Sequence, residues 1–171
     1  MVANATNSHR GDPLKQQIAR QDPRIAAWST FLRAHARVIR ELERELQSEQ
    51  DLALTDYDVL VQLSAADQRR LRMSELADDT VASRSRLSHQ INRMERAGLV
   101  TRESCDTDKR GAFAVLTARG MAQLEAAAPA HVESVRRVLM DALTPAQFAQ
   151  LGRLSTKVLA HLSLADGAPG G

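Results

Sequence analysis

The residues best suited to chemistry in this sequence are arginines that lie close together between residues 84 and 110. Four of them fall in one stretch that reads as a helix, Arg84, Arg86, Arg93 and Arg96, and Lys109-Arg110 follow in what reads as a hairpin. A guanidinium group stays charged at neutral pH and carries a rigid fork of N–H donors, which matches phosphate oxygens and the edge of guanine. A cationic helix beside a cationic hairpin predicts binding to double-stranded DNA.

The positive charge of the chain is concentrated in this region. Residues 84–119 contain eight basic and four acidic side chains, a net charge of +4, whereas the whole chain of 171 residues has a net charge of +2. The rest of the chain therefore carries a net charge of −2. A locally basic face on a nearly neutral protein is typical of nucleic-acid-binding proteins, although a basic patch taken alone is often only a solvated surface.

Two short helices and a hairpin must position these arginines. We expect one helix over about 73–79 and a second over about 84–97, with Ser83 as its N-cap and Gly98 as the residue that ends it. Two short strands over about 99–104 and 112–116 then enclose a hairpin tip at 106–111. A helix, a turn, a second helix and a hairpin in this order predict a winged helix-turn-helix.

Further helices are expected on both sides of this winged part, so the fold class is mainly α with a small β-wing. One helix should span about 23–48, and another should begin at Thr55, which has capping-box spacing to Asp58. Two more should follow the wing, one capped by Thr117 and one that begins at Thr144-Pro145 and runs to about 164.

The flanking helices carry more apolar surface than a small DNA-binding lobe could cover. The apolar side chains in and just before the last helix look like half of an intertwined interface, namely Leu143, Phe148, Leu151, Leu154, Val158 and Leu162. A homodimer would bury this surface. Its two-fold symmetry would also place two recognition helices in successive major grooves of a palindromic operator, about 34 Å apart.

These expectations divide the sequence into five segments. Residues 1–20 are expected to be a disordered arm and 165–171 a disordered tail. The dimerisation helices should lie within 21–53 and 118–164, and the DNA-binding domain within 54–117.

The sequence offers no signal for an enzyme, a metal site or a cofactor. Its five histidines are far apart, its single cysteine forms no metal-binding pair, and it has no glycine-rich phosphate loop. It has no membrane-spanning apolar run and no signal-peptide segment, so we expect a cytoplasmic protein that associates with the nucleoid when bound to DNA. A winged helix that binds protein instead of DNA stays open as an alternative.

The sequence resembles the MarR family of bacterial transcriptional regulators over about 25–164. The resemblance rests on Leu54-Thr55, Ser74-Glu75-Leu76-Ala77, Ser83-Arg84-Ser85-Arg86-Leu87-Ser88 and Arg93-Met94-Glu95-Arg96-Ala97-Gly98-Leu99-Val100. Its most specific part is the wing, Asp108-Lys109-Arg110-Gly111, followed by Leu116-Thr117-Ala118-Arg119-Gly120. The resemblance implies a regulator that is most often a repressor.

Helical periodicity divides the side chains of the 84–97 helix into two sets. Leu87, Ile91 and Met94 should face the core, which leaves the other side chains available to DNA. Arg86, near the N-terminal end, is expected to make a bidentate contact with guanine, worth roughly 1–3 kcal/mol of discrimination. Contacts to bases, phosphates or only water are expected for Ser83, Arg84, Ser85, Ser88, His89, Gln90, Asn92 and Arg93. At the start of the preceding helix, Arg72 and Ser74 are candidate phosphate anchors.

By the resemblance, Arg110 at the wing tip enters the minor groove, where narrow A·T-rich segments concentrate negative potential. Lys109 is expected to contact phosphate, and Asp108 to brace Arg110 or the hairpin turn through a charge-assisted hydrogen bond. The alternative is a solvated hairpin tip.

The resemblance also implies a small-molecule effector, a phenolic or aromatic acid that binds between the dimerisation helices and the winged helix and loosens DNA binding. Trp28, His35 and Tyr57 could line such a cleft, and Arg33 or Arg37 could meet a carboxylate. The alternative is that Trp28 and His35 simply pack in the seam of the first helix.

Cys105 leaves a redox-responsive alternative open. It lies at the base of the wing near Arg102 and Arg110, whose charges favour a thiolate, and its oxidation could disturb the wing. An incidental thiol is the competing interpretation. Family members that sense peroxide carry their reactive cysteine in the first helix, where this chain has none, so that type of sensing is not expected.

Overall fold

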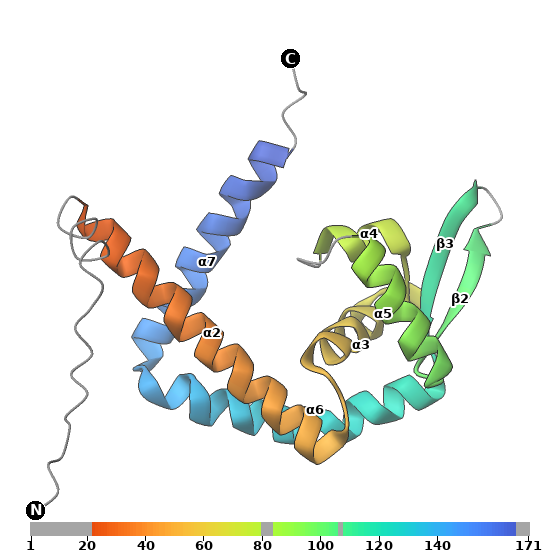
Figure 1. The fold of residues 1–171 in the computed structure, drawn as a ribbon, viewed down its shortest axis with the longest axis horizontal. Coiled ribbons are helices and arrows are strands. Elements are labelled where there is room, and N and C mark those ends of the chain that lie inside the picture. The colour runs from red at the N-terminus through yellow and green to blue at the C-terminus, as the bar shows by residue number, and fades with distance from the viewer. Residues whose placement is uncertain (1–21, 80–83, 106–107, 167–171) are drawn as a thin grey trace, which may run out of the picture. The chain divides into compact units, whose positions relative to one another are not determined.

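The computed structural model describes residues 22–79, 84–105 and 108–166, and Figure 1 shows their arrangement. The helices are α2 (Pro23–Gln50), α3 (Leu54–Ala65), α4 (Met73–Asp79), α5 (Arg84–Arg96), α6 (Ala118–Val138) and α7 (Pro145–Asp166), with short 3-10 turns η1 (Asp67–Arg69) and η2 (Met140–Ala142). The strands are β1 (Arg70–Arg72), β2 (Val100–Cys105) and β3 (Asp108–Leu116). The predicted fold class, mainly α with a small β-wing, is confirmed.

Contacts divide the chain into two compact units between Arg40 and Glu41, so the division falls inside α2. The first unit contains the N-terminal part of α2, and the second contains everything from Glu41 onward. The predicted arm at 1–20, most of the tail at 165–171 and the predicted cap Ser83 lie outside the described residues.

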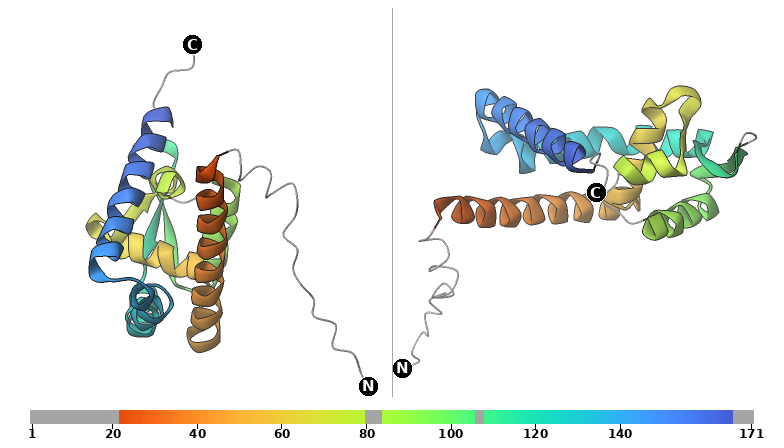
Figure 2. Two further views of the ribbon diagram at one scale, coloured as in Figure 1. Left: turned by 90° about the vertical axis from the view of Figure 1, so that its left-hand side faces the viewer. Right: turned by 90° about the horizontal axis from the view of Figure 1, so that it is seen from above.

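The sheet has three antiparallel strands in the order β1-β3-β2. The sequence analysis predicted β2 and β3, whereas it assigned no strand to the residues of β1. Its three residues are too short to show an alternating pattern, and they become a strand because β3 offers them a free edge, with Leu71 opposite Ala114. The strands β2 and β3 form the wing, and α5 lies beside this hairpin (Figure 2).

Apolar side chains from α3, α4, α5 and the sheet form the core of the second unit. The largest fully buried side chains are Val59, Leu60, Leu63, Leu76, Leu87, Ile91, Met94 and Val100. All of them are aliphatic or methionine, in agreement with the scarcity of aromatic residues in the sequence. This core holds α4, α5 and the wing together.

The predicted start of α3 was wrong. The helix begins at Leu54, and its N-cap Ala53 makes no side-chain capping bond. A carboxylate from α2 takes over this role, because the Leu54 N–H donates to Glu43 Oε2 at 2.8 Å. Other predicted helix ends are confirmed. Thr117 Oγ1 accepts from the Gly120 N–H at 2.9 Å, and Thr144 and Gln147 cap each other at the start of α7.

Gly98 and Gly120 are required by the turn between α5 and the wing and by the start of α6. Gly98 has a φ of +72°, and the Leu99 N–H donates to the Met94 carbonyl at 2.9 Å, as in a Schellman motif. A Cβ on Gly120 would overlap the carbonyl oxygen of Leu99. The Leu-Thr-Ala-Arg-Gly segment therefore packs the beginning of α6 directly onto the end of α5.

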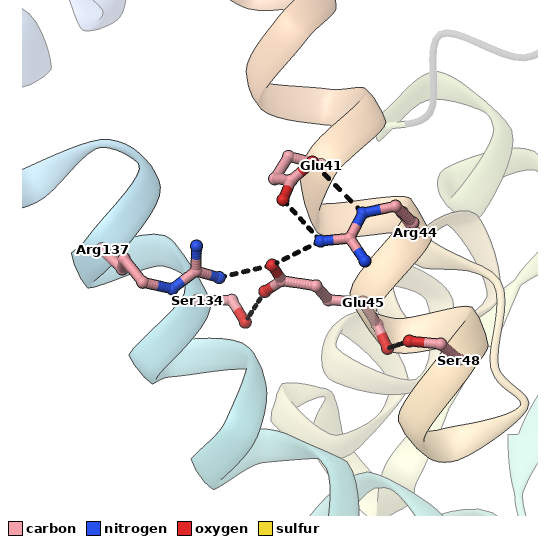
Figure 3. A network of polar contacts seen from close by, with 6 residues as sticks. All are labelled: Glu41, Arg44, Glu45, Ser48, Ser134 and Arg137. Carbon is pink, nitrogen blue, oxygen red and sulfur yellow. Dashed lines mark hydrogen bonds and ion pairs between the residues drawn. The ribbon is translucent and has the colours of Figure 1, made fainter.

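A buried carboxylate joins the C-terminal part of α2 to α6 within the second unit. The Glu45 side chain accepts hydrogen bonds from Ser134 Oγ and Arg137 Nη2, and Arg44 Nη2 lies 3.2 Å from its Oε1 (Figure 3). Glu45 is only 8% exposed. The hydrogen bonds from Ser134 and Arg137 outweigh burial and hold the pKa of Glu45 below its ordinary value.

We predict that Glu45→Gln lowers the free energy of unfolding at pH 7 by about 1–2 kcal/mol, because it removes a charged hydrogen-bond acceptor from two partners. Since the folded-state pKa of Glu45 is lowered, its stabilisation is present above the unfolded value near 4.5 and is lost as the pH falls through the folded value. The difference between wild type and variant should therefore shrink in acid. Urea unfolding at several pH values measures it.

Glu41→Gln is the matched control. Glu41 pairs with Arg44, but its side chain is 39% exposed, so its replacement should cost much less than that of Glu45. Equal stability of wild type and Glu45→Gln at pH 7 would contradict the role given to this carboxylate.

Candidate nucleic-acid interface

The rotation of α5 about its axis is fixed by its apolar stripe. Leu87, Ile91 and Met94 are at most 1% exposed, which confirms the predicted inward face. The exposed side chains of the helix are Ser85, Arg86, Ser88, His89, Asn92, Arg93 and Arg96. The helix therefore presents a polar, arginine-containing face to solvent.

One flank of α5 is bound to α3 by Asp56, a residue that the sequence analysis did not single out. Asp56 is 7% exposed, and its Oδ1 accepts from Gln90 Nε2 at 3.0 Å and from Arg93 Nη2 at 2.6 Å. Gln90 Nε2 also donates to the Thr55 carbonyl at 2.8 Å. A polar residue in a helix first turn reads as a cap in the sequence, and nothing local shows that its partners are 34 and 37 residues away.

These contacts change what Gln90 and Arg93 can do. Gln90 is half-buried and turned toward α3, so the structure gives its amide a role in holding α5 in place. Arg93 donates a hydrogen bond to Asp56 through one nitrogen, but its side chain is 56% exposed. The predicted DNA contact of Gln90 gains no support from this geometry, while that of Arg93 remains a prediction.

The other flank of α5 is bound to the wing by Arg102 of β2. The Arg102 backbone N–H donates to Glu95 Oε1 at 3.1 Å, and its guanidinium donates to the Ser88 carbonyl at 3.1 Å and to Asn92 Oδ1. Its Nη1 also lies 3.4 Å from Glu95 Oε2. Asn92, which was expected to be available to DNA, thus has its amide oxygen occupied by the wing.

A hollow of about 330 Å³ lies between the start of α4, α5 and the wing. It is lined by Met73, Ser74, Ser88, Arg102 and Ala112. The structure therefore brings two predicted DNA-contact residues, Ser74 and Ser88, to one place, although they belong to different helices. Both are exposed.

Arg72 is placed partly by α4 and partly by the sheet. Its backbone N–H donates to Glu75 Oε2 at 2.9 Å, which caps α4. Its guanidinium carbon lies 5.4 Å from the centre of the Phe113 ring, and that of Arg70 lies 4.5 Å from the same ring. The Nη1 atom of Arg70 also lies 3.6 Å from Glu103 Oε2. The two arginines form a cationic strip on β1, with Phe113 beneath them.

Part of the predicted site lies where only the backbone is described. Asp108, Lys109 and Arg110 begin β3, and Cys105 ends β2 opposite Asp108, next to a register shift at Ser104. The side chains of these four residues and of Arg84 are outside the described part, so their predicted contacts stay predictions.

The predicted effector residues fall into two groups. In the first unit, the centre of the Phe31 ring lies 6.0 Å from that of Trp28 and 6.1 Å from that of His35. Trp28 and Phe31 are more than half exposed. In the second unit, buried Tyr57 lies 4.4 Å from His131. Burial raises the pKa of Tyr57 and lowers that of His131.

Two of these aromatic contacts were missed by the sequence analysis. Phe31 has the i+3 spacing to Trp28 that could have revealed it, whereas His131 has no local signal. Arg33 is expected to bind a carboxylate. In the structure its Nη2 atom lies 3.4 Å from Thr30 Oγ1. Arg37 is exposed on the same helix.

The described part of the chain offers neither a membrane span nor a metal site. None of its helices is both long and apolar enough to cross a membrane. It also holds no group of three or more side chains arranged to bind a metal ion.

Comparison with known proteins identifies a family that shares this sequence and fold. A sequence profile of the MarR family matches residues 50–111. The solved structure of AbsC, a MarR family transcriptional regulator from Streptomyces coelicolor, is 44% identical with a TM-score of 0.76, and the match covers 83% of this chain and 95% of that chain. Sco3205, a MarR family regulator from the same organism solved in complex with DNA, is 41% identical with a TM-score of 0.76, covering 80% and 86%.

A more distant structure shares the fold. A mutant of MarR from E. coli, complexed with operator DNA, is 23% identical with a TM-score of 0.72, and the match covers 87% of this chain and 99% of that chain. A search of curated proteins found no match. With 44% and 41% identity to two such regulators over at least 80% of its length, this chain belongs to the MarR family of transcriptional regulators.

Proposed function

We propose that this protein is a homodimeric DNA-binding repressor that binds a palindromic operator and is released by a small phenolic or aromatic acid. The observation that carries the proposal is the exposed polar face of α5, which is bonded to α3 on one flank and to the wing on the other. The 41% identity to Sco3205, solved in complex with DNA, supports the same function. Repression is the commonest mode in the family.

In this proposal α5 enters the major groove. Ser85, Arg86 and His89 lie on its exposed face near the N-terminal end, where the helix dipole favours phosphate and side chains reach base edges. Arg86 makes the bidentate contact with guanine. Ser74, Ser88 and Arg72 contact the backbone on either side, and these contacts fix the register of the helix on the duplex.

The wing enters the adjacent minor groove in the same proposal. Arg110 is the inserted side chain, and Lys109 contacts phosphate, with Asp108 as a brace. Because the contacts are largely ionic, binding releases counterions condensed on the DNA. This release is less favourable in more concentrated salt, so the affinity should fall steeply as the salt concentration rises. A winged helix that binds only protein would show little such dependence.

We predict that Arg86→Ala weakens binding to the operator by roughly 5- to 150-fold, the equivalent of 1–3 kcal/mol for a lost bidentate contact. Fluorescence anisotropy with DNA from upstream of the protein's own gene, at two salt concentrations, measures this. Arg136→Ala, an exposed arginine of α6 beside Glu133, should bind as wild type does. If the protein does not bind DNA from upstream of its own gene, genomic fragments that it does bind are selected and used as the operator in this assay.

Failure of the wild-type protein to select any DNA, or equal losses for the Arg86 and Arg136 variants, would contradict DNA recognition by α5. The first outcome would favour a protein-binding winged helix.

The proposed dimer rests on the apolar side chains of α7. Leu154, Val158 and Leu162 are each more than half exposed and follow one another at intervals of four residues, so they form one row on the helix. Such a row is costly to leave in water. A second copy of the chain is the partner that also supplies two recognition helices.

Val158→Asp is therefore expected to yield a monomer with weak operator binding, because it buries a charge in the interface. Ala160→Asp is the matched control, since two residues turn the helix by about 200° and place this exposed position on the opposite side. Sedimentation velocity measures both. A dimer that persists in Val158→Asp, or is lost equally in Ala160→Asp, would exclude α7's row as the interface.

The proposed effector site is the exposed aromatic row of α2. Trp28 and Phe31 offer ring faces for an aromatic acid, whereas Arg33 and Arg37, which could meet a carboxylate, lie on other sides of the same helix. Tyr57 remains a candidate from the second unit. A redox role of Cys105 in the wing is the alternative mode of control.

Salicylate should weaken operator binding in the anisotropy assay, and benzyl alcohol, which lacks the carboxylate, should act much less. Trp28→Leu should reduce the response to salicylate while the protein stays dimeric in sedimentation. An undiminished response in Trp28→Leu would place the effector elsewhere, and release by peroxide that Cys105→Ser abolishes would favour the redox alternative.

A further inference from the structure

Arg102 stands out because its charge is turned inward. It belongs to the basic segment 84–119, yet its side chain is only 27% exposed and faces α5. Its neighbour across the sheet is Ala114, a fully buried residue on the core side. The guanidinium of Arg102 is bonded to α5, so its cationic group has a structural role within the protein.

The partners of Arg102 form one line along α5. They are Ser88, Asn92 and Glu95, at intervals of four and three residues, which puts them on the same side of the helix over two turns. All the partner atoms are oxygens that accept hydrogen bonds. The planar fork of a guanidinium can reach all three residues at once, whereas a lysine ammonium is a single point donor.

The contact between Arg102 and α5 controls the orientation of β2 and therefore of the wing. The strand ends three residues later, at Cys105, and the rise of a strand places the start of the tip about 10 Å beyond Arg102. A change in the tilt of β2 at Arg102 therefore moves the wing tip relative to the recognition helix.

DNA geometry makes this separation matter. When α5 lies in the major groove and the wing in the adjacent minor groove, one sugar-phosphate strand must pass between them. The hollow that Ser74, Ser88 and Arg102 line lies where the start of α4, α5 and the wing meet. The bonds of Arg102 thus set the spacing between the two groove contacts.

We propose that Arg102 is a positioning residue that locks the wing to the recognition helix, so that Arg110 reaches the minor groove only while the Arg102 bonds to Ser88, Asn92 and Glu95 are intact. The proposal rests on the proposed function, since it concerns how two DNA contacts are held in register. In it, Arg102 acts through Arg110 and does not itself contact DNA.

A double-mutant cycle on operator affinity tests the proposal with the full-length protein. Arg102→Lys keeps the charge but loses the fork, and it should weaken binding about tenfold, as Arg110→Ala does. Once Arg102 is lysine, adding Arg110→Ala should cost at most about twofold, because the wing contact is already lost. The salt dependence should fall by about one phosphate equivalent in either single variant and no further in the double variant.

Asn92→Ala supplies a second route to the same contact from the α5 side. It removes an acceptor of Arg102 without touching the wing, and its effect should be coupled to Arg110→Ala in the same way. Arg119→Lys, an exposed arginine at the start of α6, is the matched control and should bind as wild type does. Thermal unfolding identifies any variant that fails to fold. If Arg102→Lys fails to fold, the coupling between Asn92→Ala and Arg110→Ala tests the positioning role instead.

The outcomes separate this proposal from the proposed function. Losses that simply multiply in the double variant, or wild-type affinity in both Arg102→Lys and Asn92→Ala, would overturn the positioning role while leaving DNA binding intact. If the wild type binds no DNA, the proposed function fails first, and Arg102→Lys is then compared by hydrogen exchange of β2 and β3. Exchange that is unchanged in the variant would overturn the lock itself.

Discussion

The arrangement of the interface depends on three buried side chains of one helix. Leu87, Ile91 and Met94 bind α5 to the core so closely that the helix cannot turn about its axis without exposing them to water. Ser88, His89, Asn92 and Arg93, which lie between them, are therefore held on the surface. Asp56 and Arg102 then fix the two flanks of the helix, one against α3 and one against the wing.

Three carboxylates between residues 41 and 58 hold elements of this architecture together. Glu43 caps α3, Glu45 joins α2 to α6, and Asp56 holds α5 through Gln90 and Arg93. Each carboxylate satisfies donors that would otherwise lose their water on folding. The acceptors of one segment thus support the elements that carry the basic face.

Local sequence signals predicted much of the fold, and long-range partners explain what they missed. The stripe of α5, the cap Thr117 and the left-handed Gly98 each depend on neighbours within a few residues, so the sequence could show them. The strand β1 and the α3 cap depend on distant segments, which supply the Ala114 register and the Glu43 carboxylate. Helical periodicity tells which face is buried, but not which residue lies across from it.

The candidate site shows the same limit in more detail. Periodicity correctly left Ser85, Arg86, Ser88 and His89 on the exposed face of α5. It also left Gln90 and Asn92 available to a partner, whereas the structure gives both side chains partners within the protein, on α3 and on β2. Arg102 was counted only as positive charge, because a strand residue next to a wing gives no sign of the helix that it faces.

Methylation protection of an operator by dimethyl sulfate tests the central claim most directly, because the reagent modifies guanine N7 in the major groove and adenine N3 in the minor groove. The account predicts protected guanines in two half-sites about one helical turn apart, from the two copies of α5, with protected adenines in the adjoining minor grooves, from the two wings. Protection confined to one groove, or a single site without two-fold symmetry, would contradict it.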